Sequence, residues 1–250
     1  ERFEALSPLM EDESRQWLAA RRTDMLLRLG RYQEAVPVAR SVKEDFYTAL
    51  ADRVSTLAET MPQPRKLLLS EGTRWQGRPW DRYLEQWWQQ PPPVASWDAS
   101  PPPLDGLPNI EDRLRWQAAH WRVRDFRLTA ESVAGLIARG CPFIVHFVEA
   151  GYTQPRLAIG YDPLRNTLLW GDADERLIGE TPLEAILERQ AAFGPRATVY
   201  VPQAAADRLD SLLLPDAELY DALAAIQQAL LQHDRFSATR AYQRLQAEHP

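Results

Sequence analysis

Hydrolytic chemistry in this chain would need a thiol and an imidazole close together. The imidazole acts as a base that removes the thiol proton and so activates the sulfur as a nucleophile. The chain has one cysteine, Cys141, and the nearest histidine is His146. Cys141 directly precedes the apolar run that predicts a strand, and side chains an odd number of positions apart in a strand point to opposite faces. We therefore expect that the two do not meet. Cys141 is predicted to be a buried structural residue, as free cysteines commonly are.

The other histidines form no second catalytic or metal-binding pattern. His146 alternates with Ile144 and Val148, which predicts a hydrogen-bonded histidine in the core or at its rim. His120 and His233 are expected at the surface or in packing. No two histidines have the i, i+4 spacing of a metal site on a helix.

Cofactor and cation motifs are also missing from the sequence. No glycine loop that could cradle a phosphate is present. The acidic turn Asp172-Ala-Asp-Glu175 lacks the alternating ligands and the glycine of a calcium loop, so it is predicted to be solvated. We predict neither a metal nor a cofactor.

The composition is that of an ordinary globular chain of 250 residues, 45% hydrophobic and 26% charged. A net charge of −6 argues against nucleic acid as a partner. No apolar run approaches the roughly 20 residues that span a bilayer. The single cysteine excludes an internal disulfide and slightly favours a reducing compartment such as the cytoplasm. Because the sequence begins at Glu1 without methionine and stops at Pro250 in mid-pattern, we interpret it as a piece of a longer protein.

The stretch from Leu128 to Pro202 has an α+β pattern with an enzyme-like layout. Hydrophobic periodicity and turn residues predict, in order, a helix over 129–139, strands over 142–148, 156–161 and 167–170, a helix over 182–192 and a strand over 197–201. Upstream, a helix is expected from Glu111 to Trp121, and Lys66 to Leu69 favour a short strand.

Both ends of the chain are predicted to be helical, over residues 1–60 and 204–250. The phrase Leu29-Gly-Arg-Tyr-Gln-Glu-Ala35 resembles the turn between the two helices of a tetratricopeptide repeat. At the other end, Ala238, Tyr242, Leu245 and Pro250 fall where the small, aromatic, apolar and terminating positions of that repeat would fall. A lone repeat cannot bury its own apolar face, so each hairpin is expected to need a neighbour.

Residues 61–110 form a segment rich in tryptophan and proline. Arg78 to Gln90 has a helical pattern, and two proline triplets then enclose an extended stretch. This stretch is predicted to be a strap lying over the surface, the alternative being a docking peptide.

The central part, predicted as a domain over 111–203, resembles the second half of a papain-fold domain of the bacteriocin-processing, double-glycine peptidase type. The resemblance is carried by Leu136-Ile-Ala-Arg-Gly-Cys-Pro-Phe-Ile-Val145, Leu157-Ala-Ile-Gly-Tyr-Asp162 and Thr167-Leu-Leu-Trp-Gly-Asp172. It implies a small antiparallel sheet packed with helices. Bacterial proteins of this type often embed the domain among tetratricopeptide repeats.

The resemblance implies a cysteine nucleophile, a histidine base and an orienting Asp or Asn. The histidine position is Gln154, six residues before Gly160, while the carboxylate position retains Asp172. The nucleophile's place, roughly within Gln63 to Trp75, contains no cysteine. The chain is therefore expected not to be an enzyme.

Three functions follow from this reading. The first is a catalytically degenerate module that binds a protein or peptide in its old cleft, where Gln154 and Asp172 would form a polar floor and Trp170 an aromatic wall. The second is an active hydrolase with a rearranged site that uses Cys141. The third is a purely structural scaffold that binds its partner through the tryptophan-rich segment and the helices.

Overall fold

The computed structural model describes residues 11–56, 65–67, 80–90, 110–149, 152–171 and 179–248. The chain divides into two compact units, Glu1–Gln63 and Pro64–Pro250. Each unit has its own internal packing, and each is considered by itself.

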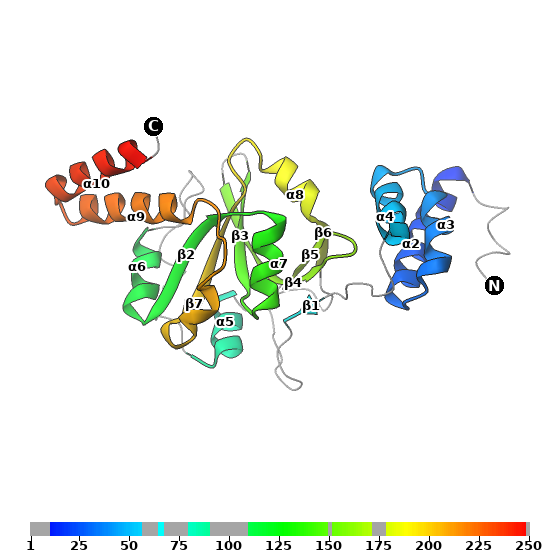
Figure 1. Ribbon diagram of the computed structural model, residues 1–250, viewed down its shortest axis with the longest axis horizontal. Coiled ribbons are helices and arrows are strands. Elements are labelled where there is room, and N and C mark those ends of the chain that lie inside the picture. Colours follow the sequence, from blue (N-terminus) through cyan, green and yellow to red (C-terminus); the bar gives the residue numbers. More distant parts are fainter. Residues whose placement is uncertain are drawn as a thin grey trace. The chain divides into compact units, whose positions relative to one another are not determined.

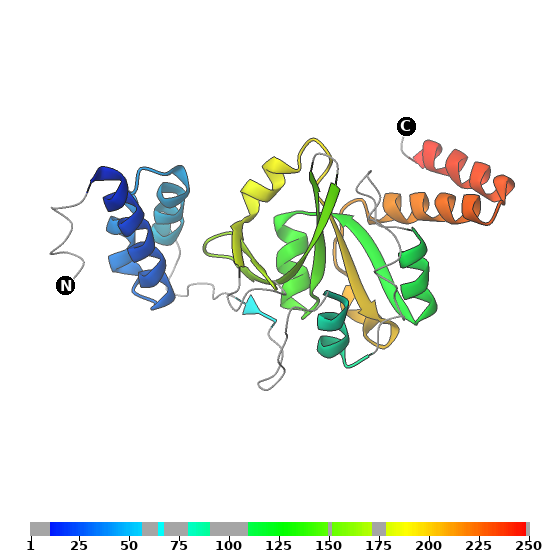
Figure 2. The same ribbon diagram turned by 180° about the vertical axis from the view of Figure 1, so that it is seen from behind.

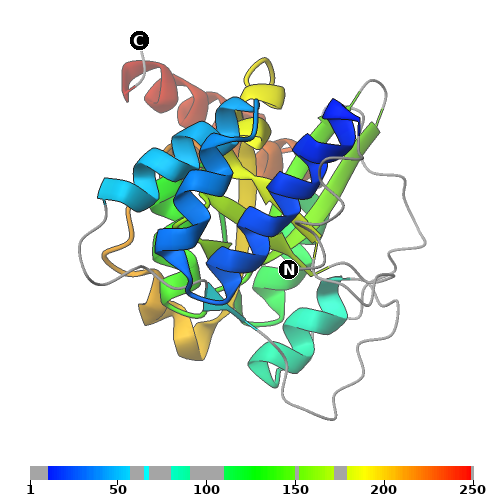
Figure 3. The same ribbon diagram turned by 90° about the vertical axis from the view of Figure 1, so that its right-hand side faces the viewer.

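The described residues of the N-terminal unit, 11–56, form the helices α2 (Asp12–Arg28), α3 (Tyr32–Arg40) and α4 (Asp45–Thr56), which pack in sequence order (Figure 3). Gly30 takes a φ of +71° and ends α2, a conformation that glycine adopts without steric cost. Ala35 and Ala39 of α3 are almost fully buried, and these small side chains let the neighbouring helices approach closely. The helices predicted for this part of the chain are confirmed over its described residues.

The second unit is built on an antiparallel sheet with the strand order β2-β7-β3-β4-β5-β6, to which β1 is added beside β4 (Figure 1). The strands are β1 (Arg65–Lys66), β2 (Trp121–Arg127), β3 (Phe143–Glu149), β4 (Tyr152–Asp162), β5 (Thr167–Trp170), β6 (Gly179–Pro182) and β7 (Arg196–Pro202). The predicted α+β class with an antiparallel sheet is confirmed.

One face of the sheet is covered by α7 (Ala130–Ala138), which lies in front of the strands in Figure 1 and behind them in Figure 2. Thr129 caps this helix, because its hydroxyl accepts from the backbone N–H of Ser132 and the Ser132 hydroxyl accepts from the N–H of Thr129. Gly140, at a φ of +72°, ends the turn that follows the helix. The core on this face includes Cys141, Phe143, Val145, Phe147, Ala158 and Trp170.

The opposite face packs against α5 (Trp80–Trp88) and α6 (Ile110–Ala118). The Trp116 ring lies 4.8 Å from the rings of both Trp121 and Tyr200, and these aromatic contacts join α6 to β2 and β7. Because β3 contributes Ile144 to this second cluster and Phe143 to the first, the alternation of the strands divides the apolar side chains between two cores.

The structure corrects the helix expected from Glu111 to Trp121. The helix ends at Ala118, and Trp121 begins β2, an element that the sequence reading missed. Of the two residues between them, His120 has a φ of +61°, at which a helix cannot continue. The alternation in Trp121-Arg-Val-Arg-Asp-Phe-Arg127 is a strand pattern, and all seven residues pair with β7.

The C-terminal part carries the helix α8 (Leu183–Arg189), the 3₁₀ helix η2 (Gln203–Leu209) and a hairpin of α9 (Ala217–Leu231) and α10 (Arg235–Glu248). Ala229, Ala238 and Leu245 are buried in the hairpin. The helices predicted over 204–250 are thus found up to residue 248. On α10, Phe236 and Tyr242 are 78% and 51% exposed.

Gly160 is the position where β1 can approach β4. A Cβ atom at this residue would lie 2.6 Å from the carbonyl oxygen of Arg65 and 2.9 Å from Leu169 Cδ1, and the first of these is backbone that cannot rotate away. Glycine is therefore required for β1 to join the sheet.

We predict that Gly160→Ala destabilises the chain by about 2 kcal/mol or more, because the new methyl group forces β1 away from β4. The matched control is Gly179→Ala in β6, where the nearest atom lies 3.4 Å away, at ordinary contact distance. Urea unfolding of both variants measures the difference. Equal stability of the two would contradict the proposed role of Gly160.

Candidate functional site

Of the three residues expected to line the cleft, Gln154 is the one that the structure places at the surface. It lies in β4, which begins at Tyr152 and is longer than the strand expected over 156–161. Gln154 is exposed and stands opposite Phe147 of β3. Asp172 lies outside the described residues.

Trp170 is buried, which corrects the expectation that it forms an aromatic wall. Its side chain is 1% exposed, and its indole N–H donates to Thr181 Oγ1 at 2.9 Å. Phe147 packs edge-on against the ring at 5.7 Å, and the Arg156 guanidinium lies 5.0 Å from the ring centroid. Phe147 therefore contacts Trp170 and pairs in register with Gln154, while the indole itself is covered.

Cys141 and His146 lie on different faces of the sheet, as their spacing predicted. Cys141 belongs to the core beneath α7 and is fully buried. Burial raises the pKa of its thiol to about 11, so that the thiol stays protonated at neutral pH. A nucleophilic cysteine needs the opposite change, a lowered pKa beside a cationic partner.

His146 starts a chain of buried hydrogen bonds on the other face. Its Nε2 lies 2.8 Å from Thr198 Oγ1, and the Thr198 hydroxyl donates to Asp125 Oδ1. Asp125 Oδ2 in turn accepts from Arg113 Nη1 at 2.8 Å. Since the one hydroxyl proton of Thr198 is given to the carboxylate, its oxygen accepts from histidine, and neutral His146 must carry its proton on Nε2.

Burial lowers the pKa of His146 to about 4, an effect that Arg196 reinforces and Asp125 opposes. A neutral histidine that is fully enclosed and already bonded is a structural group. The prediction of a hydrogen-bonded core histidine is confirmed.

The tryptophans of α5 face inward. Trp80 stacks on Trp116 at 5.8 Å, and the Trp87 indole N–H donates to the Gly140 carbonyl at 2.9 Å. Trp88 lies under the Arg208 guanidinium at 4.9 Å. Trp75 and Trp97 lie outside the described residues. The described tryptophans of this segment therefore contribute to packing and leave little aromatic surface for a partner.

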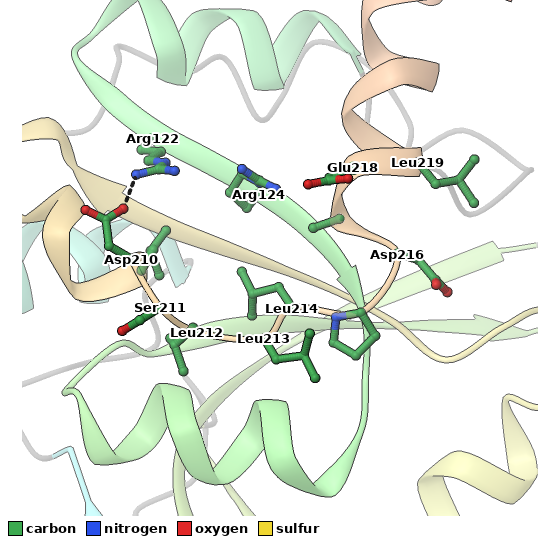
Figure 4. Close-up of a pocket in the computed structure, with 13 residues that line it drawn as sticks. Arg122, Arg124, Asp210, Ser211, Leu212, Leu213, Leu214, Asp216, Glu218 and Leu219 are labelled. Atoms are coloured by element: carbon green, nitrogen blue, oxygen red, sulfur yellow. Dashed lines mark hydrogen bonds and ion pairs between the residues drawn. The ribbon is translucent and has the colours of Figure 1, made fainter. Parts of the chain in front are cut away.

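Sequence reasoning missed a groove between β2 and the segment that leads from η2 into α9. It has a volume of about 530 Å³, and we name it the β2 groove (Figure 4). Arg122 and Arg124 of β2 form one wall, and Leu212, Leu213 and Leu214 form the other. The signal in the sequence is the alternation of arginines in β2, which is visible only once that stretch is recognised as a strand.

The walls of the β2 groove are fixed by pairs between β2 and the following segment. Arg122 Nη1 lies 3.1 Å from Asp210 Oδ1, and Arg127 Nε donates to Asp216 Oδ2 at 2.7 Å. The Arg127 N–H also donates to the Pro215 carbonyl at 2.8 Å. These contacts connect β2 to the segment that forms the other side of the groove.

Comparisons with protein-family models, with curated proteins and with solved structures found no match. Within the described residues, no set of three or more His, Cys, Asp or Glu side chains is arranged to hold a metal ion. No helix among them is long and apolar enough to cross a membrane.

We predict that His146 makes the folded state sensitive to acid. As the pH falls, an unfolded histidine with a pKa of about 6.5 binds a proton before folded His146 does, so stability is complete above pH 6.5 and is lost towards pH 4. The full loss from this group is about 3 kcal/mol. His146→Gln, whose amide can still donate to Thr198, should remove this part of the pH dependence in urea unfolding.

The control for this prediction is His120→Asn, which changes an exposed histidine and keeps a residue tolerant of a positive φ. It should retain the wild-type pH dependence between about pH 7 and pH 4.5. A His146→Gln protein with an unchanged pH dependence would show that another group is responsible.

Proposed function

We propose that this chain is a non-catalytic module that binds a segment of a partner protein in the β2 groove. The observation that carries the proposal is the groove itself, a depression of about 530 Å³ whose walls are fixed and whose lining is both apolar and charged. Binding sites for peptides and small molecules combine a mostly preformed concave shape with a few polar groups that fix orientation.

The exposed side chain of Leu213 is the strongest indication that the groove binds a ligand. Its side chain is 76% exposed at the groove, and Leu212 and Leu214 beside it are half-buried. Burying one leucine against a partner contributes about 2 kcal/mol. A segment that presents an apolar side chain to this wall would gain that contribution.

The charged groups favour a defined orientation of the ligand. Arg122 is paired with Asp210, whereas Glu218 lies across the groove from Arg124 on the N-terminal turn of α9 (Figure 4). The positive charges of Arg122 and Arg124 and the negative charge of Glu218 lie on opposite walls. A ligand segment with a basic side chain would place it toward Glu218, which fixes the direction in which the segment binds. Walls that are already held by ion pairs lower the entropic cost of binding.

Two properties of the buried groups argue for a role without catalysis. The Cys141 thiol has a raised pKa and His146 a lowered one, so neither is in the state that a thiolate–imidazolium pair requires. On this proposal, the fold that resembles a peptidase has no catalytic role and its surface serves for binding.

We predict that Cys141 reacts with a thiol reagent such as 5,5′-dithiobis(2-nitrobenzoic acid) only when the core opens. The thiol is fully buried and protonated, so its labelling rate in the native protein should follow the rate of unfolding and rise with urea. Mass spectrometry of the labelled protein measures it. Rapid labelling of the folded protein would instead favour the hydrolase that uses Cys141.

We predict that peptides selected from a phage-displayed random library bind the β2 groove. Leu213→Asp should weaken the selected peptides at least tenfold in calorimetry, because it places a charge on the apolar wall. Leu230→Asp is the matched control, since Leu230 is 53% exposed on α9 and outside the groove. The control should bind as the wild type does.

A third variant separates the two possible binding places. Gln154→Ala should leave these peptides unaffected if they occupy the β2 groove. Loss of binding in Gln154→Ala together with wild-type binding in Leu213→Asp would move the site to the cleft beside β4. A library that yields no binding peptide contradicts both.

A further inference from the structure

A second hollow, on the opposite face of β2, points to a ligand of its own. It has a volume of about 120 Å³ and opens between α6 and α9, and we name it the arginine crevice. Its polar lining is Arg113, Asp125, Arg196, Tyr220 and Gln227, and its apolar lining is Ile110, Leu223, Ala224 and Ile226. We propose that the arginine crevice binds a carboxylate that carries a short apolar group.

Such a ligand would accept hydrogen bonds from the guanidinium of Arg196. Its Nη2 lies 3.3 Å from Asp125 Oδ2, but its Nε and Nη1 are buried without a hydrogen-bond partner. The guanidinium lies 4.5 Å from the centroid of the Tyr220 ring, which holds it in place without accepting its in-plane N–H groups. Buried donors left without acceptors are costly, and an anion in the crevice would supply acceptors.

The charges around the crevice favour an anion. Arg113 is bonded to both Asp125 and Asp221, and Arg124 Nε lies 3.1 Å from Asp221 Oδ2. Arg196 shares its acidic partner, Asp125, with Arg113. An anion beside Arg196 would therefore meet a guanidinium that has no carboxylate to itself.

The shape of the crevice selects the kind of anion. Its charged groups come from the sheet and α6, whereas α9 contributes Leu223, Ala224 and Ile226 together with the polar Tyr220 and Gln227. A guanidinium matches the two-oxygen geometry of a carboxylate and of a phosphate alike. The apolar side distinguishes them, because a phosphate would gain little from Leu223, Ala224 and Ile226. A small branched carboxylic acid fits the crevice, with its carboxylate toward the arginines and its alkyl group toward the apolar residues of α9.

The carboxylate can come from a free acid or from the C-terminal end of a peptide, since both present the same group next to an apolar side chain. The experiment uses isobutyrate, its neutral analogue isobutyramide, inorganic phosphate, and a four-residue peptide ending in leucine with either a free or an amidated terminus. Binding is measured by calorimetry and by the shift in Tm of the full chain.

The expected result is that the carboxylates bind and raise Tm, whereas isobutyramide and the amidated peptide do not. Equal binding of isobutyrate and the free-terminus peptide would show that the carboxylate with its apolar neighbour is the recognised group. Binding of the free-terminus peptide alone identifies a peptide end as the ligand. Equal binding of acid and amide, tighter binding of phosphate, or no binding by either carboxylate would overturn the proposal.

Two variants place the ligand. Arg196→Gln removes the charge and should weaken isobutyrate, or the peptide if it alone binds, at least tenfold. Because this variant also deprives Asp125 of a partner, Ala224→Trp provides a second route, filling the apolar side without touching the arginines. Arg122→Gln on β2, outside the crevice, is the control and should bind normally. Wild-type affinity in Ala224→Trp would place the carboxylate elsewhere.

The outcome is independent of the proposed protein-binding role. Leu213→Asp alters the β2 groove and should leave isobutyrate binding unchanged. Loss of library peptides with retained isobutyrate binding, or the reverse, would separate the two sites.

Discussion

The carboxylate of Asp125 is the charge around which the second unit is assembled. It is 2% exposed, and it accepts from Thr198 of β7 and from Arg113 of α6, while Arg196 of β7 lies at 3.3 Å. Through Thr198 it is linked to His146 of β3. A buried carboxylate with fewer partners would be strongly destabilising, so the positions of α6, β2, β3 and β7 are mutually dependent.

Around this charge the sheet separates two kinds of interior. Beneath α7 the core is apolar and contains Cys141, Phe143 and Trp170. On the other face an aromatic cluster around Trp116 gives way, along the same strands, to the polar network of Asp125. The β2 groove and the arginine crevice are each lined by residues of both β2 and α9, so the missed strand and the C-terminal helix contribute to both.

Much of the fold could be predicted because its helices and central strands follow strong local patterns. Thr129 and Gly140 bound α7 in the sequence as they do in the structure, and the alternation around His146 indicated its burial. The strand β2 was not predicted, because Trp121 was assigned to the preceding helix and residues 122–127 to no element. Four of its seven residues are charged, which weakens the apolar alternation by which a strand is recognised. Only the ion pairs with Asp210, Asp216 and Asp221 explain why these charges lie in a sheet.

The candidate sites were harder to predict from the sequence, because their residues come from segments that are far apart along the chain. The resemblance in the sequence directs attention to Gln154 and Asp172, which occupy the expected histidine and carboxylate positions, and to Trp170 near them. The β2 groove and the arginine crevice instead combine residues from both ends of the domain, and no local pattern joins Arg122 to Leu213 or Arg113 to Tyr220. Burial of Trp170 likewise depends on Phe147 and Arg156, which are contributed by other strands.

The pairing of β2 with β7 has a kinetic consequence. These strands come from the beginning and the end of the domain's sequence, yet they pair over seven residues and place Asp125 opposite Thr198. Contacts between distant parts of a chain carry a large loop-closure entropy and form slowly. The β3–β4 hairpin can form early from local contacts, whereas the charged network closes only when β2 reaches β7. Folding of this unit should therefore end with the step that buries its charges.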